Sequence, residues 1–176
     1  RVQRRPVNDA IPPSAEVTVT TSLTGEMRLH GVAKVRYAFP GSARREVSLF
    51  IDPDWSLDAT PTVTCSANAV REVRINLAAD AGRQRLSASF PHEVSDEVTL
   101  ELHLTPKVLK IEHSPLIVPA AAKWETVARL IAQDGVQLNA KPTPAQQRLE
   151  NEDYSYKTNA KAVSIPVVRY RIGSNE

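Results

Sequence analysis

The sequence predicts a mainly β protein, an antiparallel β-sandwich with one or two short helices in its C-terminal third. Apolar and polar residues alternate through several short segments, most clearly 98–104, and a strand sends successive side chains to opposite faces. Turn residues separate these segments at short intervals, which is typical of sandwiches and barrels. A hydrophobic content of 41% in 176 residues is sufficient for a folded core.

The first 14 residues are basic and then rich in proline. We expect them to form a terminal segment or a linker, because they contain few apolar residues to anchor them. The chain begins at Arg1 rather than at Met, which predicts a removed leader or a segment cut from a longer chain. No signal peptide remains to be read, and the style of fold favours a periplasmic, cell-surface or secreted location.

Two strands are predicted at 17–23 and 26–39, with apolar side chains at odd positions facing inward. Gly31 falls on this inward face, where the missing side chain predicts a bulge or a bend. Four basic residues lie on the outward face of the second strand and form a candidate interaction surface for an acidic partner. These are Arg28, His30, Lys34 and Arg36. Simple solvation of a sheet face is the alternative interpretation.

A third strand is predicted at 46–52, and Asp52-Pro53-Asp54 then forms a turn. Two carboxylates alone are too few oxygen ligands for a Ca²⁺ site. Residues 60–105 are predicted to form a meander of four strands. Antiparallel pairing in chain order places Leu77 opposite Leu86 and Phe90 opposite Val98.

On the outward face of this meander, the same register brings Arg85 near Glu101 and His103. Pro106 stops the last strand, so we expect residues 15–106 to form the sandwich body. The remaining residues, 107–176, are expected to contain helix and a final strand. They either pack on the body or build a small second layer.

Within this last segment, Trp124, Val127, Leu130 and Ile131 are spaced as on one face of an amphipathic helix over 120–133. A buried strand over 126–132 is the alternative, since short apolar runs fit both structures. A second short helix is predicted to start near Thr143, which is followed by Pro at the first helical position. The final strand is predicted at 162–172.

No motif for chemistry is visible. The four histidines lack metal-ligand spacing, and the chain contains no nucleophile elbow, phosphate-binding loop or dinucleotide motif. We therefore expect no catalytic residue, no cofactor and no metal. A net charge of +2 and an aromatic content of 5% do not favour nucleic acid as a partner. No apolar run approaches the roughly 18 residues that would span a bilayer.

The order of strands around "EVSLFID" (46–52) and "RQRLSASF…EVTLELHL" (83–104) resembles the all-β N-terminal domain of M1-type zinc aminopeptidases. The resemblance covers about residues 15–105. The His-Glu-x-x-His and Gly-rich motifs of that family's catalytic machinery do not occur in this chain. The resemblance therefore implies a fold, and no functional residue is carried over from it.

These observations favour a non-catalytic β-sandwich module with a structural or protein-interaction role, within a larger exported or envelope protein. Its partner would be another protein or a neighbouring domain of the same polypeptide. One alternative is an accessory β-domain of a larger, peptidase-like hydrolase. The other is a carbohydrate-binding sandwich that uses a tryptophan, although Trp55 and Trp124 are better explained as core residues.

Overall fold

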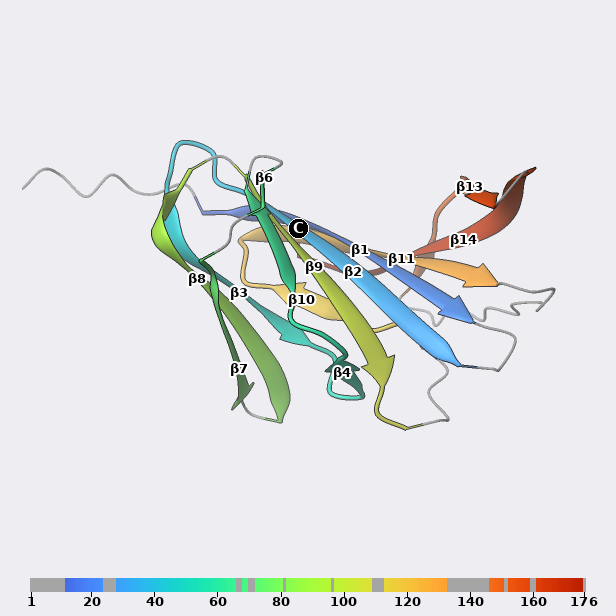
Figure 1. The fold of residues 1–176 in the computed structure, drawn as a ribbon, viewed down its shortest axis with the longest axis horizontal. Coiled ribbons are helices and arrows are strands. Elements are labelled where there is room, and N and C mark those ends of the chain that lie inside the picture. The colour runs from blue at the N-terminus through green and yellow to red at the C-terminus, as the bar shows by residue number, and fades with distance from the viewer. Residues whose placement is uncertain are drawn as a thin grey trace, which may run out of the picture.

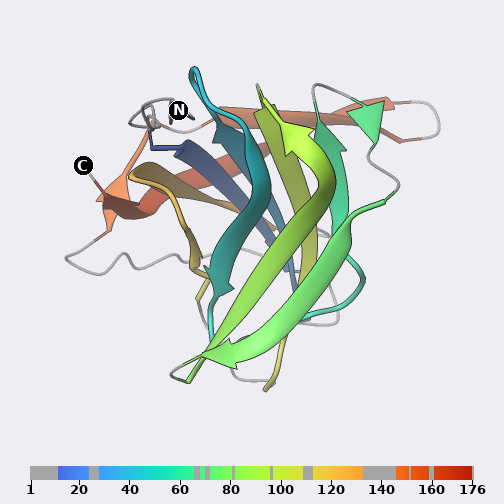
Figure 2. The ribbon, with the colours of Figure 1, turned by 90° about the vertical axis from the view of Figure 1, so that its left-hand side faces the viewer.

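The computed structural model describes residues 12–23, 28–65, 68–69, 72–80, 82–95, 97–108, 113–132, 146–150, 152–158 and 161–175. The described residues form strands and turns with no helix, arranged in a large and a small sheet (Figures 1 and 2). The chain is thus mainly β, with two sheets whose pairing is predominantly antiparallel, as predicted for a sandwich.

The large sheet runs in the order β12-β14-β11-β1-β2-β9-β5-β6, with β4 pairing to β9 and β13 to β14. Its strands are β1 (Ser14–Leu23), β2 (Leu29–Ala38), β4 (Trp55–Leu57), β5 (Thr62–Cys65), β6 (Asn68–Ala69), β9 (Glu97–Pro106), β11 (Lys123–Ala132), β12 (Gln147–Arg148), β13 (Glu152–Thr158) and β14 (Lys161–Asn175). All of these pairs are antiparallel except β1 and β11, which run in parallel over the whole of β1.

The small sheet runs in the order β10-β3-β8-β7. Its strands are β3 (Arg44–Ile51), β7 (Arg74–Asp80), β8 (Arg83–Val94) and β10 (Ile117–Pro119). Figure 2 shows β7 as the outermost strand of this sheet, beside β8. The β7–β8 hairpin turns at Gly82, whose φ of 82° lies in the left-handed region that favours glycine.

The core lies between the sheets and is made by the predicted inward residues. Buried side chains come from the large sheet at Val17, Val19, Ala33, Val35, Tyr37, Val98, Leu100, Leu102 and Leu104, and from the small sheet at Val47, Leu49, Ile51, Leu86 and Ala88. Trp55 is completely buried and belongs to the same cluster. The alternation along β1, β2, β3, β8 and β9 therefore gave the correct inward face.

The predicted helix over 120–133 is wrong, because Lys123–Ala132 forms strand β11. This strand pairs with β1 along its whole length on one side and with β14 over Trp124–Leu130 on the other, so it is an inner strand of the large sheet. Ala128 and Ile131 are both buried although they point to opposite faces. Apolar residues occur on both faces of this strand, Val127 and Ile131 on one and Ala128 on the other, so its hydropathy does not alternate and its apolar run matches a helix by coincidence.

The second predicted helix lies partly outside the described residues. Where the structure resumes, Gln147–Arg148 forms β12 and Glu152 begins β13, so the described part of that segment is not helical. The final strand is present and is longer than predicted, as β14 extends from Lys161 to Asn175. Residues 1–11 of the expected terminal segment also lie outside the described part.

The prediction that residues 60–105 form one meander of four strands is wrong, because these strands are divided between the two sheets. Leu77 does oppose Leu86, as predicted. Phe90 and Val98 do not pair, because β8 belongs to the small sheet and β9 to the large one. Consequently Arg85 lies beside Ser48, at 3.4 Å from its Oγ, and is not a neighbour of Glu101 or His103.

Gly31 does not create a bulge, since β2 stays in continuous register with β1 and β9 through this position. The space beside Gly31 is filled by neighbouring side chains. A Cβ atom added there would lie 3.2 Å from Pro115 Cγ and 3.3 Å from the Trp55 ring. The glycine therefore makes room for Trp55 to close the core, and the strand does not need to bend.

Candidate functional site

The basic stripe predicted on β2 is an ion-pair ladder. Lys34 Nζ lies 3.2 Å from Glu101 of β9, and Arg36 lies 2.7 Å from Glu97 of β9 and 3.5 Å from Glu16 of β1. Cross-strand register places these groups together, because Lys34 opposes Glu101 and Arg36 opposes Glu16. The acidic side chains of the flanking strands offset the positive charge of the stripe.

His30 and Arg28 complete the stripe. The His30 ring lies beside the His103 ring of β9, with centroids 5.7 Å apart. His103 Nε2 in turn lies 3.4 Å from Glu101. Arg28 is exposed at the start of β2. The sequence predicted the outward direction of these side chains, but their acidic neighbours follow from which strands flank β2.

Arg36 and Glu97 give this ladder a testable pH dependence. The hydrogen bond from the Arg36 guanidinium lowers the pKa of the Glu97 carboxyl below its usual value of 4.5. A lowered pKa in the folded state stabilises the fold above the unfolded-state pKa, and this contribution is lost as the pH falls through the folded pKa. We expect Arg36→Gln to raise the Glu97 pKa, measured by NMR titration of its side-chain carboxyl carbon.

Lys34→Gln is the matched control for this titration, because Lys34 is paired with Glu101 and not with Glu97. It should leave the Glu97 pKa unchanged. An unchanged Glu97 pKa in Arg36→Gln would show that the pairing is absent in solution.

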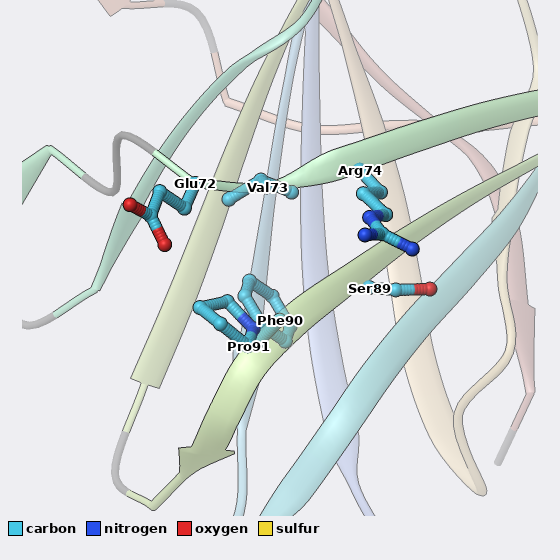
Figure 3. A pocket seen from close by; sticks show the side chains of 6 residues that line it. All are labelled: Glu72, Val73, Arg74, Ser89, Phe90 and Pro91. Carbon is cyan, nitrogen blue, oxygen red and sulfur yellow. The ribbon is translucent and has the colours of Figure 1, made fainter.

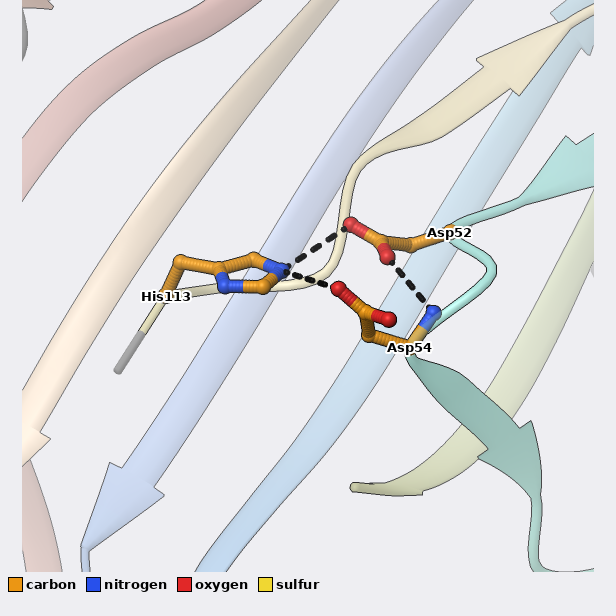
Figure 4. Close-up of side chains that lie close together, drawn as sticks. All are labelled: Asp52, Asp54 and His113. Carbon is orange, nitrogen blue, oxygen red and sulfur yellow. Dashed lines mark hydrogen bonds and ion pairs between the residues drawn. The ribbon is translucent and has the colours of Figure 1, made fainter. Parts of the chain in front are cut away.

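A second group of ionisable side chains joins the turn after β3 to the segment before β10 (Figure 4). His113 Nε2 lies 3.3 Å from Asp52 Oδ2 and 3.9 Å from Asp54 Oδ2. Asp52 also accepts hydrogen bonds from the backbone N–H groups of Asp54 and Leu116. Its carboxylate therefore fixes both the turn and the neighbouring segment.

The ligand atoms of these three residues all lie within 4.8 Å of one another. Two carboxylates and an imidazole are donors that suit a divalent transition metal. Both Asp52 oxygens, however, already accept backbone hydrogen bonds. These bonds hold the turn after β3 to the segment before β10, which explains why the three side chains lie close together. Sequence reasoning missed the group because about 60 residues separate His113 from Asp52, with no spacing signal between them.

A hollow of about 500 Å³ lies where β7 and β8 begin to pair (Figure 3). It is lined by Glu72, Val73, Arg74, Ser89, Phe90 and Pro91. Figure 3 shows Glu72 and Arg74 on opposite sides of Val73, with the Arg74 side chain directed towards Ser89. The hydroxyl of Ser89 donates a hydrogen bond to the Glu46 carboxylate on β3, at 3.4 Å.

The most unusual surface is the strand β7, which is exposed along its length. Ile75 and Leu77 oppose Ala88 and Leu86 and so face the core side of the small sheet. Leu86 is 0% exposed, whereas Leu77 is 47% exposed. The outer edge of β7 pairs with no described strand. We call this surface the β7 edge, meaning Arg74–Asp80 with its core-side residues Ile75, Leu77 and Ala79.

The two tryptophans differ in exposure. Trp55 is completely buried, and Trp124 is partly buried against the core cluster. The Trp124 ring also lies over Gly173, where an added Cβ would come within 3.0 Å of it. Trp55 is thus a core residue, as predicted, and Trp124 packs in the same layer.

Comparison with known protein families and with curated proteins finds no match for this chain. Among solved structures, two of the M1 zinc metallopeptidase from Deinococcus radiodurans, one of them a mutant, are similar to it at 10% identity. They cover 93% of this chain, with TM-scores of 0.43 and 0.44. This chain spans only 38% and 39% of their length.

These matches confirm the predicted resemblance to a segment of M1 aminopeptidases. At this level of similarity, no functional residue, activity or partner of the metallopeptidase is transferred to this chain. Among the described residues, no helix is both long enough and apolar enough to cross a membrane.

Proposed function

We propose that this chain is a non-catalytic β-sandwich module that binds another protein or a neighbouring domain through its β7 edge. The observation that carries the proposal is the position of Leu77. It faces the same side of the small sheet as the buried Leu86, yet it is 47% exposed. An apolar side chain on a core-facing layer is expected to be covered in the functional assembly.

The backbone of β7 supports the same proposal. It ends the small sheet, so its outer N–H and C=O groups have no partner strand among the described residues. Edge strands are usually protected by proline, by a bulge or by a charge at the strand centre. β7 pairs with β8 without a register shift, and its charged residues, Arg74 and Asp80, lie only at its ends. The edge is therefore suited to accept a further strand.

A non-catalytic role is supported by what the ionisable groups contact. The stripe on β2 is paired with glutamates, and Asp52, Asp54 and His113 hold a turn to a neighbouring segment. Each group thus has a structural use. Membership of a larger exported or envelope protein, or of a larger hydrolase, stays a prediction that the flanking gene sequence tests. Trp55 is buried, so the carbohydrate-binding alternative would have to use the partly buried Trp124, and it stays a prediction.

Site-specific photo-crosslinking in the organism that makes the protein tests this proposal. A crosslinking amino acid is placed at Leu77 in one variant and at Lys34 in the other. Both positions are exposed, and they lie on different sheets. We expect a defined adduct from position 77, identified by mass spectrometry, and none from position 34. An adduct from position 34 alone, or from neither position, would contradict the proposal.

A further inference from the structure

The sequence of β7 is self-complementary about its central residue. Arg74 and Asp80 lie at equal distances on either side of Leu77, as do Ile75 and Ala79. An antiparallel copy of β7 that is centred on Leu77 therefore places Arg74 opposite Asp80 and Ile75 opposite Ala79. Because directly opposed residues share a face, Arg74 and Asp80 meet on the outer face, and the apolar residues meet on the core side.

We propose that the occupant of the β7 edge is a second copy of this chain, paired antiparallel through Arg74–Asp80. This inference rests on the proposed function and names its partner. The two small sheets then join into one continuous sheet across a two-fold axis at Leu77. The axis generates the Arg74–Asp80 contact twice, as a self-complementary interface requires. It also brings the two exposed Leu77 side chains together, which shields them from water.

Charge favours this register over the neighbouring ones. A shift of one residue would place apolar side chains of one copy opposite the polar face of the other. A shift of two residues would keep the faces matched but would leave the charges at the strand ends unpaired. Within one chain, no side-chain hydrogen bond or ion pair joins Arg74 or Asp80 to another described residue, and Asp80 lies directly opposite Arg83 of β8. In the dimer Asp80 would lie between Arg83 of its own chain and Arg74 of the second copy, and Arg74 would gain a carboxylate neighbour.

The β7 edge also lacks the features that normally prevent such pairing. Ile75, Leu77, Ala78 and Ala79 are apolar, and no proline or lysine interrupts the strand. Every residue of β7 except Ile75 is exposed. The hollow beside Val73 lies at one end of the strand and leaves space around Arg74. A second strand can thus approach without displacing any described element of the fold.

Sedimentation equilibrium with charge-swapped variants tests this inference. The unmodified chain should dimerise as its concentration rises. Arg74→Asp should weaken dimerisation about tenfold, because two attractive contacts become two repulsive ones, and Asp80→Arg should do the same. The double variant restores opposite charges at both ends of the strand, and we expect its dissociation constant to return close to that of the unmodified chain.

Arg45→Asp is the matched control, since Arg45 is an exposed arginine on β3 of the same sheet, which β8 separates from β7, and it forms an ion pair with Glu93. It should leave dimerisation unchanged, and thermal unfolding would confirm that each variant is folded. A chain that stays monomeric up to about 1 mM, a limit that excludes even weak association, would overturn the inference. So would a dimer that is insensitive to Arg74→Asp, or single-variant losses that the double variant does not restore.

These outcomes are separable from a failure of the proposed function. If the chain is monomeric but position 77 still crosslinks to a different protein, the β7 edge is a contact surface and only the identity of its partner is wrong. If position 77 crosslinks to nothing in the cell and the chain is monomeric, both proposals fail.

Discussion

Leu86→Ala should destabilise the protein by about 2–5 kcal/mol, the range measured for large-to-small substitutions in well-packed cores. Leu86 is 0% exposed on β8 and belongs to the core cluster between the two sheets. Truncating it removes buried apolar area and leaves a cavity that the flanking strands can fill only in part. Urea denaturation monitored by far-ultraviolet circular dichroism would measure the loss.

Leu77→Ala is the matched comparison, since it makes the same chemical change at the residue directly opposite Leu86. Leu77 is 47% exposed, so its truncation should reduce stability by less than about 1 kcal/mol in the isolated, monomeric chain. An equal loss at the two positions would mean that β7 is covered in solution, and the β7 edge would then not be an open surface.

A fragment that ends at Pro106 should fail to fold, which is the larger of the two expected effects. In the large sheet β11 pairs with every residue of β1, and in the small sheet β10 pairs with β3. Removing both would expose one whole edge of β1 and would uncover core residues near Ile117, which is 0% exposed. We expect no cooperative unfolding transition and poor dispersion in the ¹H–¹⁵N NMR spectrum.

The complete chain is the control for this fragment and should unfold cooperatively. This experiment also tests the predicted boundary between a body at 15–106 and a separate segment at 107–176. A well-dispersed spectrum from the fragment would contradict our expectation and would support that boundary. Thr21 strengthens the case for one unit, because its buried hydroxyl donates a hydrogen bond of 2.9 Å to the Ser114 hydroxyl on the other side of that boundary.

Strand identity and inward faces could be predicted because they depend on local alternation. Leu100 and Leu102 are both 0% exposed, as their spacing in 98–104 required. The Leu77–Leu86 register was also predictable, because a short turn at Gly82 joins the two strands directly. Information of this kind is contained within a few residues of the chain.

Sheet membership could not be predicted in the same way. The residues between β8 and β9 carry the chain from the small sheet to the large one, and their composition does not distinguish this crossing from a hairpin turn. The parallel pairing of β1 with β11 joins residues more than 100 positions apart. The helix expected at 120–133 is also wrong, since β11 has apolar residues on both faces and its sequence shows no period of two.

For the candidate surfaces too, local features could be predicted from the sequence, and contacts between distant segments could not. The outward direction of Lys34 and Arg36 was predictable, but their glutamate partners depend on which strands flank β2. The proximity of His113 to Asp52 depends on how residues 107–116 return to the turn after β3. The exposure of Leu77 depends on where the large sheet ends, because its own sequence context resembles that of a buried strand.

Residue-resolved amide hydrogen exchange across Arg74–Asp80, in dilute protein, tests the β7 edge most directly. Successive amides of an edge strand point alternately towards the neighbouring strand and away from it. We predict slow exchange for those bonded to β8, fast exchange for those on the outer edge, and slowing of the fast set as the protein is concentrated. Uniformly slow exchange across the strand at low concentration would show that another element covers β7 and would contradict the account.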